Sequence, residues 1–262
     1  MRRCLNAMKL LGARAAPIAA LLAIWQLAVS SRLVNADFLP SPYAISVAGV
    51  DLVRGGELWS NLGLTLLASF GGLALALLIG VPAGMLMAKS RVADSVLGPL
   101  VKATYSLPKT ALIPLFFLWF GIGATTDMVA VMLACLLPLL VYAHHGVQAV
   151  PRVLVWSAEC MGTPPARIFY AIELPASLAA ILTGLRIALG FSFVLAISAE
   201  MIAAKSGIGR LMVEYGENGS YDYMFAAVSA IVIVAFAADR GLIALTAHAL
   251  RWQEPHHSAG AA

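Results

Sequence analysis

Long runs of uncharged, mostly apolar residues alternate with short polar segments along nearly the whole chain. Most of these runs approach or exceed the roughly 20 residues that a helix needs to cross the hydrocarbon core of a bilayer. The runs cover residues 15–31, 58–88, 96–123, 128–147 and 174–199, and the last one starts near residue 223 and extends past residue 238. The pattern therefore predicts about six membrane-spanning helices.

Two segments depart from this simple pattern. Lys102, Pro108, Lys109 and Pro114 interrupt the third run, and proline distorts a helix because it lacks an N–H, so this run is expected to form a broken or kinked span. The segment 38–57 mixes apolar and polar residues after two turn prolines. It is expected to form an amphipathic helix on the outer surface of the membrane.

The overall composition agrees with a membrane protein. Hydrophobic residues make up 61% of the 262 residues and charged residues 11%, whereas a soluble domain has roughly 45–50% and roughly 25%. The mean hydropathy is +0.89. We expect an all-α, polytopic membrane helix bundle that forms one transmembrane domain over residues 1–262, with a core at about 58–251 and no soluble appendage.

The distribution of lysine and arginine predicts the orientation of the bundle. Basic residues collect before the first run and after the second, fourth and sixth, and cytoplasmic loops are enriched in them. Both termini and the polar loop 156–175 are therefore expected to be cytoplasmic. This bias explains the net charge of +4 without a nucleic-acid partner. A basic N-terminus also fits a cleaved signal peptide, but the lack of a small-residue cleavage site favours a retained anchor.

Small residues recur every four positions in the second and fifth runs, which predicts faces where helices approach closely. The first stripe contains Ala68, Gly72, Ala76, Gly80, Gly84 and Ala88, and the second contains Ala180, Gly184, Ala188, Ser192 and Ala196. A stable bundle of any function accounts for both stripes.

No motif for ATP hydrolysis or for metal chemistry is present. The phosphate-binding pattern GxxxxGK[ST] does not occur, so an ATP-driven protein would need a second chain to bind the nucleotide. His144 and His145 are adjacent and would point about 100° apart on a helix, so they cannot share a metal. Ser192 lies in an incomplete GxSG string. We expect a non-catalytic membrane chain without a cofactor, and a secondary transporter or an intramembrane hydrolase are the alternative classes.

Two ionisable residues of the fifth run are candidates for a translocation path. Arg186 follows Pro175 by about a dozen residues, which places it roughly 16–18 Å along a helix, near the middle of the bilayer. A charge at this depth needs a partner or a wet cavity. Arg186 therefore lines an anion path or pairs with a carboxylate or with backbone carbonyls. Glu200, on roughly the same face, is expected at the outer mouth or at the interface.

The loop 156–175 carries a recognisable spacing. It resembles the coupling loop of ABC transporter permeases, whose pattern is EAAxxxG, nine residues, then IxLP. Here Trp156 and Ser157 replace the Glu-Ala pair of that pattern, and the positions that fall in register are Ala158, Gly162, Ile172, Leu174 and Pro175. The segments 38–42, 106–123 and 199–212 are similar to permeases of the nitrate, taurine and aliphatic sulfonate subgroup.

The resemblance implies a MetI-like permease of a type I importer in the bacterial inner membrane. Its implied partners are a cytoplasmic ATPase that holds ATP and magnesium, an extracytoplasmic solute-binding protein, a second and identical permease subunit, and the lipid bilayer. It also implies import of a small, anionic nitrogen or sulfur compound. The replacement of a common arginine by Ala68 leaves the substrate within this class open.

The resemblance further implies which residues receive the movement of the ATPase. Gly162 permits a sharp turn, the two prolines after it stiffen the backbone, and residues 166–171 are expected to form a short helix that ends before Leu174. The expected coupling residues are Trp156, Ser157, Ala158, Gly162, Thr163, Pro164, Ala166, Arg167, Ile172, Leu174 and Pro175.

Overall fold

The computed structural model describes residues 16–17, 19–35 and 37–252, and no strand occurs in them. This confirms the expected all-α bundle. The elements are α2 (Pro42–Arg54), α3 (Glu57–Lys89), α4 (Arg91–Tyr105), the 3₁₀ turn η1 (Lys109–Leu112), α5 (Ile113–Phe120), α6 (Ala124–Gln148), α7 (Arg152–Cys160), α8 (Pro165–Ile168), the π-helical turn η2 (Phe169–Glu173), α9 (Leu174–Ala203), α10 (Ile208–Glu217) and α11 (Tyr221–Ala249).

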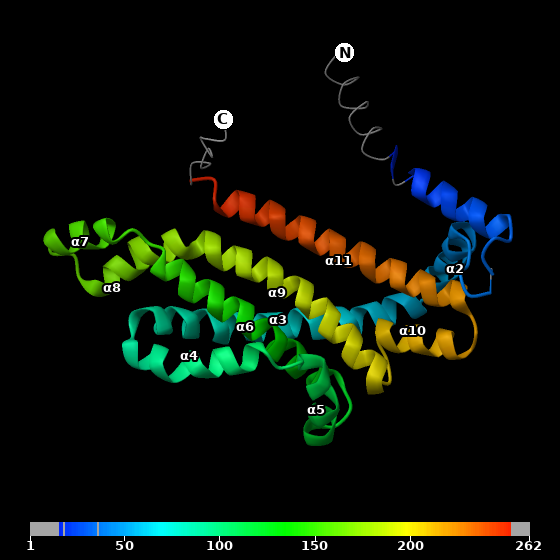
Figure 1. The fold of residues 1–262 in the computed structure, drawn as a ribbon, viewed down its shortest axis with the longest axis horizontal. Helices are drawn as coiled ribbons and strands as arrows, with labels where there is room; N and C mark the ends of the chain where they lie inside the picture. Colours follow the sequence, from blue (N-terminus) through cyan, green and yellow to red (C-terminus); the bar gives the residue numbers. More distant parts are fainter. Residues whose placement is uncertain (1–15, 18, 36, 253–262) are drawn as a thin grey trace, which may run out of the picture.

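Long helices lie side by side in one elongated bundle (Figure 1). Four helices in the described part of the chain are long and apolar enough to cross a membrane, namely α3, α6, the continuous helix Pro165–Ala203 and α11. They match four of the six predicted spans. The described part of the first run forms the shorter helix Ala19–Ser30, and the rest of that run lies outside the described residues.

The third predicted span is not one helix. The chain leaves α4 after Tyr105, passes through the segment 106–108 and continues as η1 and α5. Proline disfavours a helical conformation in the residue before it, so Pro108 ends the helix at this point. In Figure 1, α5 turns away from the long axis that α4 follows. The apolar helix that remains, Lys109–Phe120, has only 12 residues, too few to cross a bilayer alone.

The first stripe of small residues packs α3 against α6. Ala68 and Ala76 are almost completely buried. A Cβ atom added at Gly72 would lie 2.6 Å from the Cβ of Val131, and one added at Gly84 would overlap the backbone carbonyl of Leu140. The two backbones therefore approach more closely than any larger side chain would allow, as the stripe predicts.

The second stripe packs α9 against α6. Ala188 is fully buried, and its backbone carbonyl accepts a hydrogen bond of 3.2 Å from the Cys135 thiol of α6. A Cβ atom added at Gly184 would lie 2.6 Å from the Cβ of Tyr142. The helix α6 thus packs against both α3 and α9, which also contact each other.

The amphipathic segment 38–57 contains the helix α2, and only some of its apolar side chains are buried. Ser41 caps the helix because its hydroxyl oxygen accepts a hydrogen bond of 3.2 Å from the Ala44 amide. The buried side chains are Ile45, Ala48 and Leu52, whereas Val47, Val50 and Val53 are exposed. The buried face packs against α11, so this helix is joined to the bundle.

Candidate functional site

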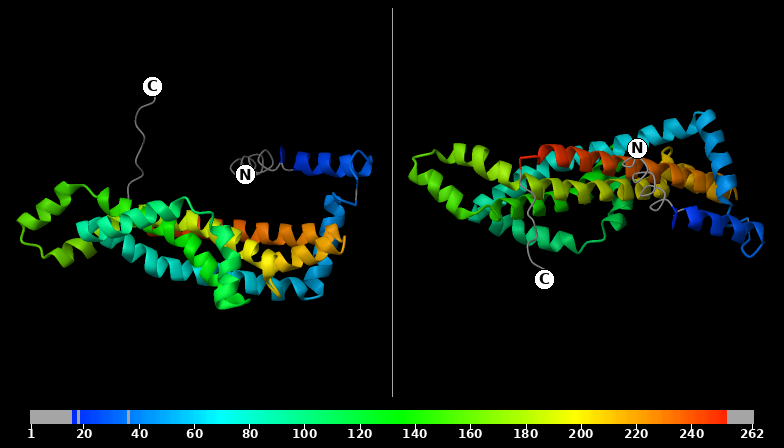
Figure 2. Two further views of the ribbon diagram at one scale, coloured as in Figure 1. Left: turned by 60° about the horizontal axis from the view of Figure 1, so that its bottom comes forward. Right: turned by 90° about the horizontal axis from the view of Figure 1, so that it is seen from above.

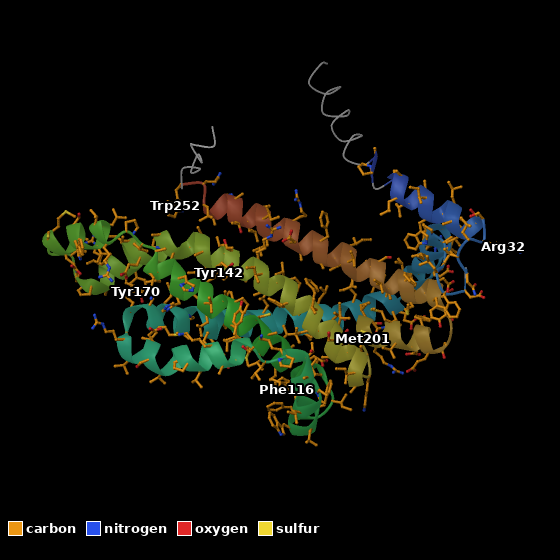
Figure 3. All side chains as sticks on the ribbon, viewed as in Figure 1. Arg32, Phe116, Tyr142, Tyr170, Met201 and Trp252 are labelled. Carbon is orange, nitrogen blue, oxygen red and sulfur yellow. The ribbon has the colours of Figure 1, made fainter. Side chains whose placement is uncertain are left out.

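A helical hairpin extends beyond the end of α6. The chain turns at residues 149–151, forms α7, turns again at residues 161–164 and returns through α8 towards α9. Figures 1 and 2 show this hairpin at one end of the molecule, far from α10. In Figure 3 Tyr170 lies at this end and Arg32 at the other. We refer to the hairpin, residues 152–173, as the α7–α8 hairpin.

The tip of the hairpin depends on a left-handed glycine. Gly162 has a φ of 72°, which side chains other than glycine rarely adopt. Its amide donates to the Glu159 carbonyl at 2.9 Å, and the Thr163 amide donates to the Ala158 carbonyl at 3.0 Å. Pro164 and Pro165 then fix the backbone at the start of α8. The turn expected at Gly162 is therefore present, and it is tied by backbone hydrogen bonds.

The predicted coupling residues are distributed over the whole hairpin. Trp156, Ser157 and Ala158 lie in α7, Gly162, Thr163 and Pro164 in the turn, Ala166 and Arg167 in α8, Ile172 in η2, and Leu174 and Pro175 at the start of α9. Ala158 is buried, whereas Trp156, Ser157, Gly162, Pro164, Ala166 and Arg167 are exposed. Most of the predicted set therefore forms an accessible surface.

The expected short helix does not end before Leu174. The helix α8 continues through the π-helical turn Phe169–Glu173 directly into α9. Pro175 explains the wide turn, because its ring would collide with the carbonyl four residues earlier in an α-helix and it offers no N–H. The Leu174 amide instead donates to the Phe169 carbonyl, five residues back. A displacement of α8 would therefore act directly on a membrane-spanning helix.

An ion pair connects the hairpin to α3. The ammonium of Lys89, the last residue of α3, pairs with the Glu173 carboxylate and lies 4.8 Å from the centre of the Phe169 ring. Glu173 is 9% exposed. Sequence reasoning did not select either residue for this role. The available signals were a single acidic residue inside the IxLP string and a lysine at the end of a span.

A cavity of about 660 Å³ opens beside this ion pair, between the hairpin and the ends of α3 and α6. Its lining combines an aromatic ring with charges of both signs. The lining side chains include Lys89, Arg152, Trp156, Glu159 and Glu173. This chemistry suits contact with a polar protein surface better than storage of an apolar ligand.

Arg186 pairs with a carboxylate. Its Nε and Nη2 atoms donate to Oδ1 and Oδ2 of Asp239 at 2.6 and 3.0 Å. This bidentate pair connects α9 to α11 and supplies the counter-charge that a cation inside a membrane span needs. Sequence reasoning did not select Asp239 as the partner of Arg186, although the last predicted span runs past residue 238. The placement of Arg186 along a translocation path stays a prediction.

Glu200 is the centre of a buried hydrogen-bond network at the α10 end. Its Oε2 atom accepts from the Thr65 hydroxyl at 2.9 Å and from the Gly209 amide at 2.8 Å. The Thr65 oxygen in turn accepts from the Ile208 amide at 2.9 Å. Glu200 is 2% exposed. The network binds the first turn of α10 to α3 and α9, and a role for Glu200 in a path stays a prediction.

A second carboxylate lies near this network. Asp127 of α6 is 5% exposed, and its Oδ1 atom has no hydrogen-bond partner among the described residues. Asp127, Glu200 and Lys205 line one cavity of about 220 Å³.

The residues considered for catalysis have other contacts. The Ser192 hydroxyl is fully buried and donates to the Leu189 carbonyl at 2.8 Å. His144 Nε2 lies 3.9 Å from Asp94 Oδ1. Among the described residues, no group of three histidine, cysteine, aspartate or glutamate side chains is arranged to hold a metal ion. These contacts give no support to a nucleophile at Ser192.

Comparisons with known proteins agree with one another. The model of the family described as "Binding-protein-dependent transport system inner membrane component" matches residues 76–246. The taurine transport system permease protein TauC of Escherichia coli K12 is 32% identical over 90% of this chain and 87% of its own length. The putative aliphatic sulfonates transport permease protein SsuC of the same organism is 32% identical over 90% of both chains.

The fold also resembles a solved transporter structure. A chain from the inward-facing MetNI methionine ABC transporter aligns with a TM-score of 0.62 at 20% identity. The alignment covers 76% of this chain and 95% of that chain. This likeness supports a shared helix-bundle fold.

Proposed function

Because the chain belongs to the family of binding-protein-dependent transport system inner membrane components, and is therefore the permease subunit of an ABC importer, we propose that it imports a small sulfonate. Taurine and aliphatic sulfonates are the substrates in the names of the two Escherichia coli relatives. Nitrate and related small anionic nitrogen or sulfur compounds form the wider class.

The observation that carries the mechanism is the continuity of the α7–α8 hairpin with α9. Exposed residues such as Trp156 and Arg167 offer a surface to a separate ATPase, and η2 joins this surface to a spanning helix. The pair between Lys89 and Glu173 adds α3 to the same unit. A rigid-body movement of the ATPase is then passed to two helices at once, which opens the bundle alternately to each side.

The assembly contains two copies of this chain, two cytoplasmic ATPase subunits and one extracytoplasmic solute-binding protein. ATP and magnesium are bound by the ATPase subunits, and this chain holds no cofactor. The permease lies in the bacterial inner membrane with both termini and the α7–α8 hairpin in the cytoplasm. The excess of basic residues at that end of the predicted spans supports this orientation.

Copurification from detergent tests the proposal. The cognate ATPase should remain bound to the wild-type chain, and deletion of residues 162–167 should release it. Trp156→Ala with Arg167→Glu should weaken the interaction without shortening the chain. Arg210→Glu is the matched control, because Arg210 lies in α10 at the opposite end of the molecule. Retention of the ATPase after the deletion, or uptake driven by an ion gradient without an ATPase, would contradict the proposal.

A further inference from the structure

Two cavities follow the surface between α4 and α6. The larger, of about 460 Å³, is lined by residues that include Lys102, Tyr105 and His144. The smaller, of about 290 Å³, is lined by residues that include Tyr105, Lys109 and Tyr142. Tyr105 and Val141 belong to both linings. The two cavities therefore adjoin, and we refer to them together as the α4–α6 track.

The track follows the length of α4. This helix has 15 residues and is therefore about 22 Å long, and the half-buried Lys109 lies just beyond its end. The larger cavity reaches Asp94 in the first turn of α4, beside His144. In Figure 3 Tyr142, a residue of α6, lies between Tyr170 and Met201 along the length of the molecule. The track thus extends along α4 from Lys109 to Asp94, and α4 begins towards the α7 end of the molecule (Figure 1).

The two lysines of the track have no acidic partner in the described part of the chain. The ion pairs found there use Lys89, Arg186, Arg210 and His144 as their basic members. Lys109 Nζ instead lies 5.8 Å from the centre of the Tyr105 ring. An ammonium within a membrane bundle faces a counter-charge or water, and these two lysines face the track.

The walls of the smaller cavity suit a short organic anion. Tyr105 and Tyr142 carry phenolic O–H groups, and Ile187 and Phe191 of α9 add an apolar side. The cavity volume is near the lower end of the roughly 300–1,000 Å³ range of small-molecule sites. The sulfonate group of such an anion can accept hydrogen bonds from the lysine ammonium and the tyrosine hydroxyls, while the short alkyl chain of the same molecule contacts the apolar wall.

We propose that the α4–α6 track binds the anionic group of the substrate during passage, with Lys109 as the inner counter-charge and Lys102 as the next one towards the cytoplasm. This inference rests on the proposed function and names its binding residues. The Arg186 guanidinium already has Asp239 as its counter-charge, whereas these two lysines have no acidic partner in the described part of the chain.

Transport by the whole complex tests the role of the lysines. The permease, its ATPase and its binding protein are reconstituted in vesicles, and uptake of taurine is measured with receptor and substrate in excess. Lys109→Gln should lower the turnover at least tenfold and Lys102→Gln at least threefold, whereas Lys109→Arg should retain most of it. Arg91→Gln is the matched control, because Arg91 is an exposed cation of α4 outside both linings. Wild-type turnover in Lys109→Gln would overturn the inference.

A second measurement does not depend on the substrate. With Cys4 and Cys160 replaced by serine, Tyr105→Cys places an accessible thiol in the track, while Cys135 is fully buried. The rate of reaction with a negatively charged methanethiosulfonate is divided by the rate with a positively charged one, both for this thiol and for a thiol at the exposed position Val96. This ratio should be higher at position 105 than at position 96. Adding Lys109→Gln should lower this ratio at least threefold.

The two measurements separate the possible failures. If the wild-type complex imports no taurine although the thiol ratio behaves as expected, the substrate named under the proposed function is wrong and the anionic track stands. If the ratio at position 105 equals that at position 96, or does not respond to Lys109→Gln, the track is not an anion site.

Discussion

The Lys89 ammonium and the Glu173 carboxylate form an ion pair that joins the last residue of α3 to the last residue of the π-helical turn before α9. The two residues are 84 positions apart in the chain. Two spanning helices are therefore fastened to each other where the α7–α8 hairpin enters the bundle. A movement of the hairpin that displaced α9 alone would have to break this pair.

Breaking the pair should uncouple the hairpin from α3. Glu173→Gln leaves Lys89 without its counter-charge, and because the Lys89 side chain is 39% exposed the loss of stability should be about 1–2 kcal/mol, between the values for surface and buried pairs. ATP-driven uptake should fall more than ATPase copurification does. The exchange Lys89→Glu with Glu173→Lys should restore part of the uptake, and an exchange no better than either single variant would argue against a direct pair.

Gly162 should tolerate asparagine better than valine. Its φ of 72° costs an ordinary L-residue about 1–2 kcal/mol, whereas asparagine visits this conformation more readily. An added Cβ atom would meet nothing within 4 Å, so the cost comes from the backbone alone. ATPase copurification should therefore decrease in the order Gly162→Asn, Gly162→Ala, Gly162→Val. Equal recovery of all variants would show that the turn does not set the position of the hairpin.

The spans and their packing faces were predictable from the sequence because they depend on local patterns. Apolar runs gave the four long helices, and small residues at every fourth position gave the contacts of Gly72 and Gly84 with α6. Pro108 signalled the break in the third run, although the runs alone did not show that α5 leaves the axis of α4.

The charge pairs were not predictable in the same way. Arg186 needed a partner on energetic grounds, but Asp239 lies 53 positions away and becomes its neighbour only when α9 and α11 pack together. Lys89 is one of the basic residues after the second run that predict the orientation of the bundle, and nothing local connects it to Glu173. The π-helical turn was missed because Pro175 was expected to begin a new helix, whereas the wider turn accommodates the proline within a continuous one.

Replacing Gly84 by alanine should disturb the packing of α3 against α6, whereas replacing Gly63 by alanine should not. A methyl group at Gly84 would overlap the Leu140 backbone carbonyl, whereas one at Gly63 meets nothing within 4 Å. Gly84→Ala should cost about 1–3 kcal/mol because the backbones must separate. Gly63→Ala, the matched control in the same helix, should be neutral or slightly stabilising. Thermal unfolding in detergent measures the difference, and equal midpoints would contradict the close approach.

Removal of the Glu200 carboxylate should loosen the start of α10. Glu200→Ala leaves the Gly209 amide without its acceptor, at a cost of about 1–3 kcal/mol for the unsatisfied group, whereas the Thr65 hydroxyl can still donate to the Asn61 carbonyl at 3.2 Å. Hydrogen exchange at Ile208 and Gly209 should accelerate. Glu214→Ala is the control, because Glu214 lies in α10 together with Ile208 and Gly209 and its side chain is 53% exposed. Unchanged exchange in Glu200→Ala would mean that other contacts hold α10.

Neutralising Arg186 and Asp239 together should be milder than removing either one. Each single variant, Arg186→Leu or Asp239→Leu, leaves one charge inside a spanning helix, and insertion scales put that cost at about 2.5–3.5 kcal/mol. The double variant removes both charges and loses only the bidentate contact between α9 and α11. The yield of folded permease in the membrane should therefore be lowest in the single variants and recover in the double variant. If the yield of the double variant falls by the sum of the two single losses, each residue has a separate role and the pair does not account for the position of Arg186.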